Sequence, residues 1–338
     1  MQRRIEPTLS VVIPVYNEAE VMPILLERLT EALRSLGSSI QDYEIVFVND
    51  GSSDGTPGLL QQWVERDSHV VAVNFSRNFG QQPAISAGLS TAAGEVIVIM
   101  DADLQDPPEL IPEMLEAWRN GAQVVIPRRR SRKESGLRRL AFDLFPYVFE
   151  WLSDYPIRLK SGVFGLMDRV VVDELNRMTE RHRFLPGLFG WVGFRQVVVW
   201  YDRSERAAGQ PKQSLRRLLR YGFDAIFSFS YKPLRLSLIC GVIVSFTAFT
   251  YATILLTLRL LNINVVRGFT TPTVAILFLG GVQLIGIGIL GEYLGRIYDE
   301  VKLRPLYVVD EVWRHSRPQK RGESGARLVP DRALSGEE

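Results

Sequence analysis

Two stretches of the chain carry no charged side chain, and they constrain its fold more than any other feature. Residues 236–258 and 268–291 contain no Asp, Glu, Lys or Arg and are 23 and 24 residues long. As helices, each would be about 35 Å long, against a membrane hydrocarbon core of about 30 Å. Only nine residues, 259–267, connect them. The pattern predicts a hairpin of two membrane-spanning helices, with two core helices of a soluble protein as the alternative.

The charges beside these stretches predict an orientation. Residues 212–235 carry six Lys or Arg, and Arg296, Lys302 and Arg304 follow the second stretch, whereas the connector carries two. Basic residues concentrate on the cytosolic side of membrane helices. We therefore expect a multi-pass protein of the cell (inner) membrane with both termini in the cytoplasm.

The segment 214–231, just before the first stretch, has a different pattern. Its apolar residues recur at spacings of three and four, and its arginines lie off that stripe, which predicts an amphipathic helix in the membrane interface.

Overall composition excludes several classes of function. The 338 residues include 40 Lys and Arg against 38 Asp and Glu, so a net charge of +2 provides no argument for nucleic-acid binding. One cysteine excludes a disulfide framework or a Cys-rich metal site, and three scattered histidines argue against a His-based metal site. The N-terminus lacks the apolar core of a signal peptide. The first 200 residues are therefore expected to stay in the cytosol.

The N-terminal part alternates short β-branched runs with segments of helical periodicity. This alternation predicts a parallel α/β sheet, in which ligands bind beyond the carboxyl ends of the strands. Polar clusters follow three of the expected strands, and Asp54 is a candidate helix N-cap. The expected strands are 9–14, 43–48, 70–74, 95–100 and 122–126, and the expected helices are 18–36, 54–68, 81–93 and 108–120.

Asp101 and Asp103 are the sharpest candidate site. They stand two residues apart directly after a buried strand, so both carboxylates leave the fold at the ligand-binding edge. A hard divalent cation prefers oxygen ligands, commonly one or two carboxylates together with substrate phosphates. Such a cation neutralises a diphosphate leaving group. The pair therefore predicts a site for Mg²⁺ or Mn²⁺ at Asp101 and Asp103.

Several motifs together resemble glycosyltransferase family 2. Four segments resemble the GT-A domain of this family: VVIPVYNE at 11–18, VNDGSSDGT at 48–56, SRNFG at 76–80 and MDADLQDPPE at 100–109. The later segments RFLPGLFGWVGFRQ, GQPKQS, SFSYKPLR and GEYLGRIYDEVKLRPLYVV resemble the polyprenyl-phosphate glycosyltransferases of that family, which include polyprenyl-phosphate glucosyltransferases and dolichol-phosphate mannose synthase. The resemblance covers roughly residues 8–310.

The resemblance implies a fold, a reaction and its substrates. The fold is an α/β GT-A domain, a Rossmann-like nucleotide-diphospho-sugar transferase, joined to an amphipathic interface helix and a two-helix transmembrane hairpin. The reaction is inverting transfer of a sugar from a nucleotide-diphosphate sugar to polyprenyl (undecaprenyl or dolichyl) phosphate. UDP-glucose is the first choice of donor, and GDP-mannose, UDP-galactose and UDP-GlcNAc stay open. The lipid bilayer is an implied partner, and relatives of this kind favour a homo-oligomer.

The resemblance also assigns roles to individual residues. Asp101 and Asp103 would bind the metal, and Asp103, Arg206 and Lys212 would be catalytic, the two cations closing near the donor phosphates. The donor-binding residues would be Pro14, Tyr16, Glu18, Asp50, Asp101, Ala102, Gln105 and Arg128.

Val163 departs from the family pattern. Many relatives read TGDF where this chain reads SGVF, so an aspartate proposed as catalytic base falls on Val163. The acceptor is a phosphate monoester with a second pKa of about 6, so it is mostly ionised at neutral pH. Little proton is left for a base to remove. We therefore expect Val163 to affect acceptor positioning or rate and to leave the reaction class unchanged.

The expected organisation has four parts. The parts are a GT-A domain at 1–211, a juxtamembrane helix at 212–235, the two spans within 236–297 and a cytosolic tail at 298–338.

Three other classes of protein compete with this interpretation. A processive polysaccharide synthase usually carries a Q-x-x-R-W motif, and this chain has no Arg-Trp pair. A non-catalytic membrane partner that retains the fold is motivated by Val163. Transport by the hairpin alone lacks the polar residues that pathways through a membrane use.

Overall fold

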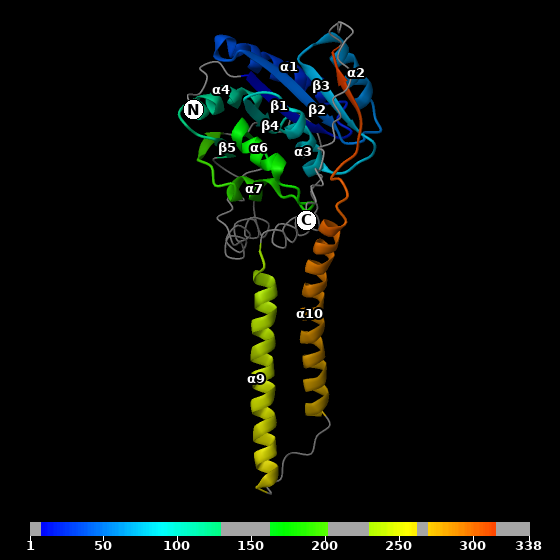
Figure 1. Ribbon diagram of the computed structural model, residues 1–338, viewed down its shortest axis with the longest axis vertical. Coiled ribbons are helices and arrows are strands. Elements are labelled where there is room, and N and C mark those ends of the chain that lie inside the picture. Colours follow the sequence, from blue (N-terminus) through cyan, green and yellow to red (C-terminus); the bar gives the residue numbers. More distant parts are fainter. Residues whose placement is uncertain (1–7, 130–162, 202–229, 262–269, 316–338) are drawn as a thin grey trace, which may run out of the picture.

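The computed structural model describes residues 8–129, 163–201, 230–261 and 270–315. These residues form a sheet covered by helices, from which two long helices extend side by side (Figure 1). The sheet has eight strands in the order β7-β5-β6-β4-β1-β2-β3-β8. The strands are β1 Thr8–Val15, β2 Asp42–Asn49, β3 Val70–Phe75, β4 Val96–Ile99, β5 Val124–Arg129, β6 Gly165–Asp168, β7 Gln196–Tyr201 and β8 Val309–Arg314.

Helices cover both faces of the sheet, as expected for strands that are apolar on both sides. Leu9, Val11 and Ile13 of β1 pack with α1, α2 and α4 on one face, and Val12 packs with α3, α6 and α7 on the other. The helices are α1 Met22–Ser35, α2 Thr56–Arg66, α3 Gln81–Thr91, α4 Ile111–Arg119, α6 Arg169–Arg177, α7 Leu185–Trp191, α9 Lys232–Leu260 and α10 Thr270–Val301, with 3-10 turns η1 Gly37–Ser39 and η2 Pro108–Leu110.

The sheet is mixed, which corrects the expectation of a parallel sheet. β1 pairs in parallel with β2 and β4, and β2 pairs in parallel with β3. However, β6 runs antiparallel to β4 and β5, and β8 runs antiparallel to β3. β6 is only four residues long, and β8 carries charges because it is an edge strand with one side exposed. Neither sequence has the apolar run that marks a central parallel strand.

Some predicted boundaries are also wrong. The first helix starts at Met22 and not at Glu18, and the segment 108–120 divides into η2 and α4. Asp54 is not an N-cap, because Gly55 holds that position. The Asp54 carboxylate nevertheless accepts a hydrogen bond from the backbone N–H of Thr56 at 3.0 Å, so it still satisfies a free donor at the start of α2.

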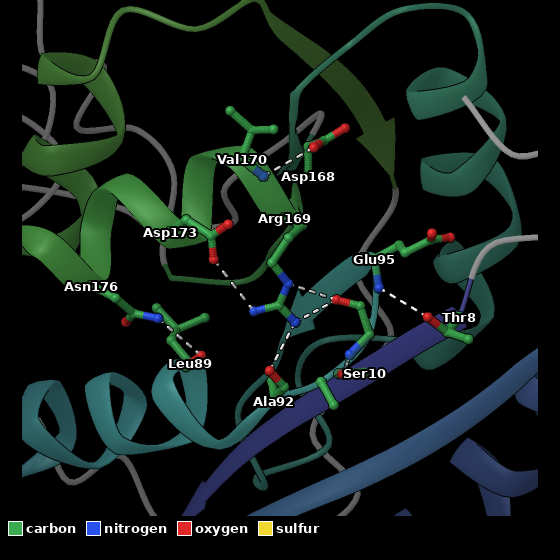
Figure 2. Close-up of polar contacts among 12 residues, drawn as sticks. Thr8, Ser10, Leu89, Ala92, Glu95, Asp168, Arg169, Val170, Asp173 and Asn176 are labelled. Carbon is green, nitrogen blue, oxygen red and sulfur yellow. Dashed lines mark hydrogen bonds and ion pairs between the residues drawn. The ribbon is translucent and has the colours of Figure 1, made fainter. Parts of the chain in front are cut away.

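Polar contacts at the amino end of β4 fix the sheet to α6. The guanidinium of Arg169 donates to the carbonyl oxygens of Ala92 and Gly94, with the Nε–O distance to Gly94 at 2.9 Å (Figure 2). The backbone N–H of Gly94 donates to Ser10 Oγ at 2.7 Å. These side chains satisfy backbone groups of the chain itself. The opposite edge, where β1, β2 and β4 end, holds the candidate site.

The two long helices have the dimensions of membrane spans. α9 and α10 contain 29 and 32 residues, and apolar side chains such as Phe246 and Leu284 are 72% and 71% exposed. Helices that expose such residues are not the core helices of a soluble domain. Both are long and apolar enough to cross a membrane. Tyr293 Oη of α10 donates to the carbonyl oxygen of Ser230, just before α9, at 2.6 Å, which joins the ends of the pair that face the sheet domain.

The end of α10 contacts the sheet domain directly. The backbone N–H of Arg181 donates to Glu300 Oε1 at 2.7 Å, and His182 Nε2 lies 3.3 Å from Asp299 Oδ2. Residues 292–301 of α10 thus lie beyond the predicted span 268–291. The second predicted helix therefore continues past the apolar stretch and contacts the sheet domain.

The segment after α10 is not simply a tail, which corrects the expected division at residue 298. Tyr307 stacks on Phe75 of β3 with ring centroids 5.0 Å apart, and its hydroxyl lies 3.1 Å from Ser90 Oγ. The chain then adds β8 to the edge of the sheet. The amphipathic stretch 214–231 lies outside the described residues except for Ser230 and Tyr231, and most of the expected tail lies outside them too.

Close packing of α3 on β1 yields a stability prediction. A Cβ at Gly88 would stand 2.2 Å from Val12 Cγ1, whereas a Cβ at Gly58 of α2 would meet nothing within 4 Å. Gly88→Ala should therefore lower the free energy of unfolding by about 1–3 kcal/mol. Gly58→Ala, the matched control, should raise it by about 0.4–1 kcal/mol, because alanine loses less backbone entropy than glycine. Denaturant unfolding of the detergent-solubilised chain measures both, and equal midpoints would refute the packing argument.

Candidate active site

The candidate site lies at the edge of the sheet where parallel strands end. β1 leads into Tyr16 and Glu18, β2 leads into Asp50, and β4 leads into Asp101 and Asp103. Because β1 pairs in parallel with both β2 and β4, these residues leave the sheet at the same edge. The structure thus brings together the polar clusters that the sequence marked separately.

Hydrogen bonds join the loops that follow β1 and β2. The backbone N–H of Asn17 donates to Ser52 Oγ at 3.0 Å, and Ser53 N–H donates back to Asn17 Oδ1 at 2.8 Å. Glu18 N–H donates to Thr56 Oγ1 at 3.2 Å. Asn17 adopts a φ of 54°, a left-handed conformation that asparagine tolerates better than most residues. These bonds present Tyr16, which is 46% exposed, at the rim of the site.

Asp50 anchors the loop before α3. Its Oδ1 accepts from the backbone N–H of Phe79 at 2.6 Å and its Oδ2 from that of Gly80 at 2.9 Å. The side chain is buried at 4% exposure, and this burial raises its pKa, opposed by the two backbone donors and by Arg77. Both oxygens therefore bind the protein's own backbone here. The expected contact of Asp50 with the donor base and ribose stays a prediction.

Asp101 is the most electrostatically perturbed group of the site. Its pKa is raised to about 7, first by burial and then by Asp106, Asp103 and Glu18, while a hydrogen bond from Gln81 acts in the opposite direction. Gln81 Nε2 donates to Asp101 Oδ1 at 2.7 Å. Negative groups placed this close repel one another unless a proton or a cation lies among them.

This arrangement fits a hard cation. Asp103 Oδ1 accepts from the backbone N–H of Gln105 at 3.1 Å, which orients the second carboxylate. Within the described residues, no group of three or more His, Cys, Asp or Glu could by itself hold a metal ion. Asp101 and Asp103 would therefore supply part of a ligand set completed by phosphate oxygens and water, as is usual for Mg²⁺ sites. Ala102 is buried between them and Gln105 is partly buried, which keeps the segment close to the strand end.

The structure places only some of the other expected residues. Pro14 is partly buried in β1. Arg128 lies near the end of β5, and because β5 and β4 both run antiparallel to β6, β5 ends at the same edge as β4. Arg206 and Lys212 lie outside the described residues, so their roles stay predictions.

Val163 occupies the same edge as the aspartates. Gly165 pairs with Ile99, so Val163 precedes that pair by two residues just as Asp101 follows it by two. The valine is 7% exposed and packs in the apolar cluster on the α3 side of the sheet. The position expected for a catalytic base thus faces the interior with an apolar side chain.

Gln81 was missed in the sequence. A glutamine in the first turn of a helix has no distinctive pattern, and its bond to Asp101 joins residues 20 apart. The one available signal was its position immediately after SRNFG, a motif already assigned to the site.

Comparison with known proteins identifies the family. The sequence profile described as Glycosyl transferase family 2 matches residues 10–173. An uncharacterized glycosyltransferase of Synechocystis is 45% identical over 307 residues, covering 90% of this chain and 95% of that protein. The chain belongs to glycosyltransferase family 2. A prophage bactoprenol glucosyl transferase homolog of Escherichia coli is 41% identical, covering 90% of this chain and 99% of its own.

Further relatives extend this comparison. The SfII prophage-derived bactoprenol glucosyl transferase of Shigella flexneri is 41% identical, covering 89% of this chain and 97% of its own. A solved mannosyltransferase, PcManGT from Pyrobaculum calidifontis in complex with GDP-Man and Mn²⁺, gives a TM-score of 0.45 at 16% identity, covering 86% and 87% of the two chains. A likeness this distant bears on neither donor nor metal. The sequence relatives, in contrast, match this glycosyltransferase over nearly its full length, including the long helices.

The raised pKa of Asp101 predicts a pH-dependent stability. The folded protein holds this proton more tightly than the unfolded chain, so between roughly pH 4 and 7 the free energy of unfolding falls as pH rises. Asparagine cannot ionise. In EDTA, Asp101→Asn should therefore be more stable than the wild type at pH 8 by roughly 1–4 kcal/mol, and the difference should shrink toward pH 4. Unfolding curves at both pH values measure this, and an equal difference at both would exclude Asp101 as the titrating group.

Proposed function

We propose that this glycosyltransferase moves a hexose, with glucose as the first choice, from a nucleotide-diphosphate sugar to polyprenyl phosphate. The observation that carries the proposal is the full-length match to relatives named bactoprenol glucosyl transferase. Such a match includes the long helices as well as the GT-A domain. UDP-glucose is the proposed donor, with GDP-mannose, UDP-galactose and UDP-GlcNAc as alternatives. A homo-oligomer formed through the membrane helices belongs to the same proposal.

The reaction takes place at the cytosolic face of the cell membrane. Lys232 and Arg235 lie at the start of α9, Arg296 lies in the last turns of α10, and Lys302 directly follows α10. The start of α9 and the end of α10 are the helix ends nearest the sheet domain (Figure 1). Basic residues favour the cytosolic side, which supports a cytosolic catalytic domain. The lipid tail of polyprenyl phosphate cannot leave the bilayer. A catalytic domain attached to a membrane hairpin therefore stays beside its acceptor.

Different residues of the site would bind the metal, the phosphates and the nucleotide of the donor. Asp101 and Asp103 would hold a divalent cation, Mg²⁺ or Mn²⁺, which would supply positive charge against the negative charge that develops on the departing diphosphate. Arg128, Arg206 and Lys212 add positive charge near the same phosphates. The first loop, with Pro14, Tyr16 and Glu18, and the residues Asp50, Ala102 and Gln105 bind the nucleotide and sugar.

The chemistry is a direct displacement. A phosphate oxygen of the acceptor attacks the anomeric carbon, a new carbon–oxygen bond forms, and the bond from that carbon to the diphosphate oxygen breaks with inversion. The nucleoside diphosphate leaves with the bonding electrons. With a second pKa of about 6, the acceptor phosphate is already mostly ionised. The valine at position 163 is therefore compatible with catalysis.

Transfer of label into lipid tests the proposal. Purified protein with polyprenyl phosphate and Mg²⁺ or Mn²⁺ receives a panel of labelled donors, and we expect label from UDP-glucose in the lipid phase. Asp103→Ala should reduce that signal at least about 10²-fold, because it removes a metal ligand and charge stabilisation of the transition state. Normal transfer by this variant would refute the site assignment. Absence of both nucleotide and metal binding in calorimetry would favour a non-catalytic membrane partner.

Val163→Asp tests whether a base is missing. A new carboxylate here has little proton to remove, so turnover should stay below the about 10²–10⁴-fold gain expected of general base catalysis. Because Val163 is buried, unfolding temperature must be followed in parallel, with Val163→Asn as the uncharged control. A gain of several orders of magnitude for Asp but not Asn would show that a base at this position is required for fast transfer.

A further inference from the structure

Gln81 contacts a proposed metal-binding carboxylate without being a metal ligand itself. It is the first residue of α3, it is exposed, and its side-chain nitrogen lies 2.7 Å from Asp101 Oδ1. A side-chain amide nitrogen can only donate, so this oxygen of Asp101 is engaged on that side. A carboxylate has a second oxygen, so Asp101 could still bind a cation while it accepts this bond.

The backbone around Gln81 holds it in this place. Asp50 accepts the N–H groups of Phe79 and Gly80, the two residues immediately before Gln81. Gly80 has a φ of +103°, a conformation that suits glycine, and the chain turns there directly into α3. On the other side of the loop, a Cβ at Gly51 would stand 2.5 Å from the carbonyl carbon of Arg77, so the segment 76–80 lies tightly against the end of β2.

We propose that Gln81 is a positioning residue that orients Asp101 toward the divalent cation. This inference rests on the proposed function, since it assumes that Asp101 binds the metal. Outer groups that hydrogen-bond a metal ligand fix its orientation, and their loss commonly weakens metal affinity. The donor is fixed relative to the carboxylate, because the 2.7 Å bond to Asp101 Oδ1 comes from a residue that directly follows the two backbone N–H groups held by Asp50.

The neighbouring Gln82 provides a matched control. It stands on the same turn of α3, but its Oε1 accepts from the backbone N–H of Leu185 at 3.2 Å. Methionine matches the length of glutamine and removes the amide. Gln81→Met and Gln82→Met therefore make the same chemical change at adjacent positions, with only the first removing the donor to Asp101.

Mn²⁺ binding distinguishes the two glutamines. EDTA-treated full-length protein in detergent is titrated with Mn²⁺ and followed by electron paramagnetic resonance, with and without UDP. Gln81→Met should raise the dissociation constant about 10–100-fold, whereas Gln82→Met should leave it unchanged. In the transfer assay, Gln81→Met should raise the cation concentration for half-maximal rate and leave the donor KM at saturating cation unchanged.

Three results would overturn the inference. Equal Mn²⁺ binding by Gln81→Met and wild type would overturn it alone and leave the proposed function intact. A raised donor KM with unchanged Mn²⁺ affinity would instead make Gln81 a donor contact. No Mn²⁺ binding by the wild type, with or without UDP, would overturn both this inference and the metal assignment. Because Gln81 is exposed, its variant should unfold at the wild-type temperature, which separates a local effect from misfolding.

Discussion

Parallel pairing of β1 with β2 and β4 is the constraint on which the site depends. It ends three strands at one edge, so that loops from residues 15–19, 50–56 and 100–106 meet although they are far apart in the chain. The loops then stabilise one another through side-chain to backbone bonds, such as those of Asn17 with residues 52 and 53. At the opposite edge, Arg169 and Ser10 mainly support the fold: Arg169 donates to the carbonyl oxygens of Ala92 and Gly94, and Ser10 Oγ accepts from Gly94 N–H and donates to Glu44. Chemistry and structural support are thus divided between the two ends of the strands.

The site gathers several carboxylates around Asp101. Burial first, and then the nearby charges of Asp106, Asp103 and Glu18, raise the pKa of Asp101 to about 7. An enzyme that binds an anionic diphosphate would not gain from such a cluster unless a cation lay between the two. The electrostatics, the donor class and the metal therefore form a single proposal. The rest of the positive charge is expected from segments that include Arg206 and Lys212.

The hairpin and the catalytic domain are joined by more than one chain connection. α10 contacts Arg181 and His182 at its end, and the chain then stacks Tyr307 on Phe75 and adds β8 to the sheet. These contacts resist separation of α10 from the sheet domain. A fixed connection suits an enzyme whose acceptor stays in the bilayer while its donor arrives from solution.

Local pattern was sufficient for much of the fold. Apolar periodicity predicted strands β1 to β5 and helices α1 to α4, and the two uncharged stretches predicted α9 and α10. Such predictions are possible because burial and membrane insertion depend on residue type at regular spacing. Asp101 and Asp103 were recognisable because two carboxylates directly follow a strand. The position of β6 and β8 was not predictable, since a short or edge strand owes its existence to a partner distant in sequence.

By itself, the sequence determined the family, the alternation of strands and helices, the apolar hairpin and the carboxylate pair. Only the tertiary structure decided that Asp50 binds the backbone of residues 79 and 80, that Val163 lies buried at the level of Asp101, and that Gln81 donates to that carboxylate. The physical reason is the same in each case. These contacts form only once the strands pair and α3 packs on the sheet. Residue type alone does not show which side chains, distant in sequence, will then lie within contact distance.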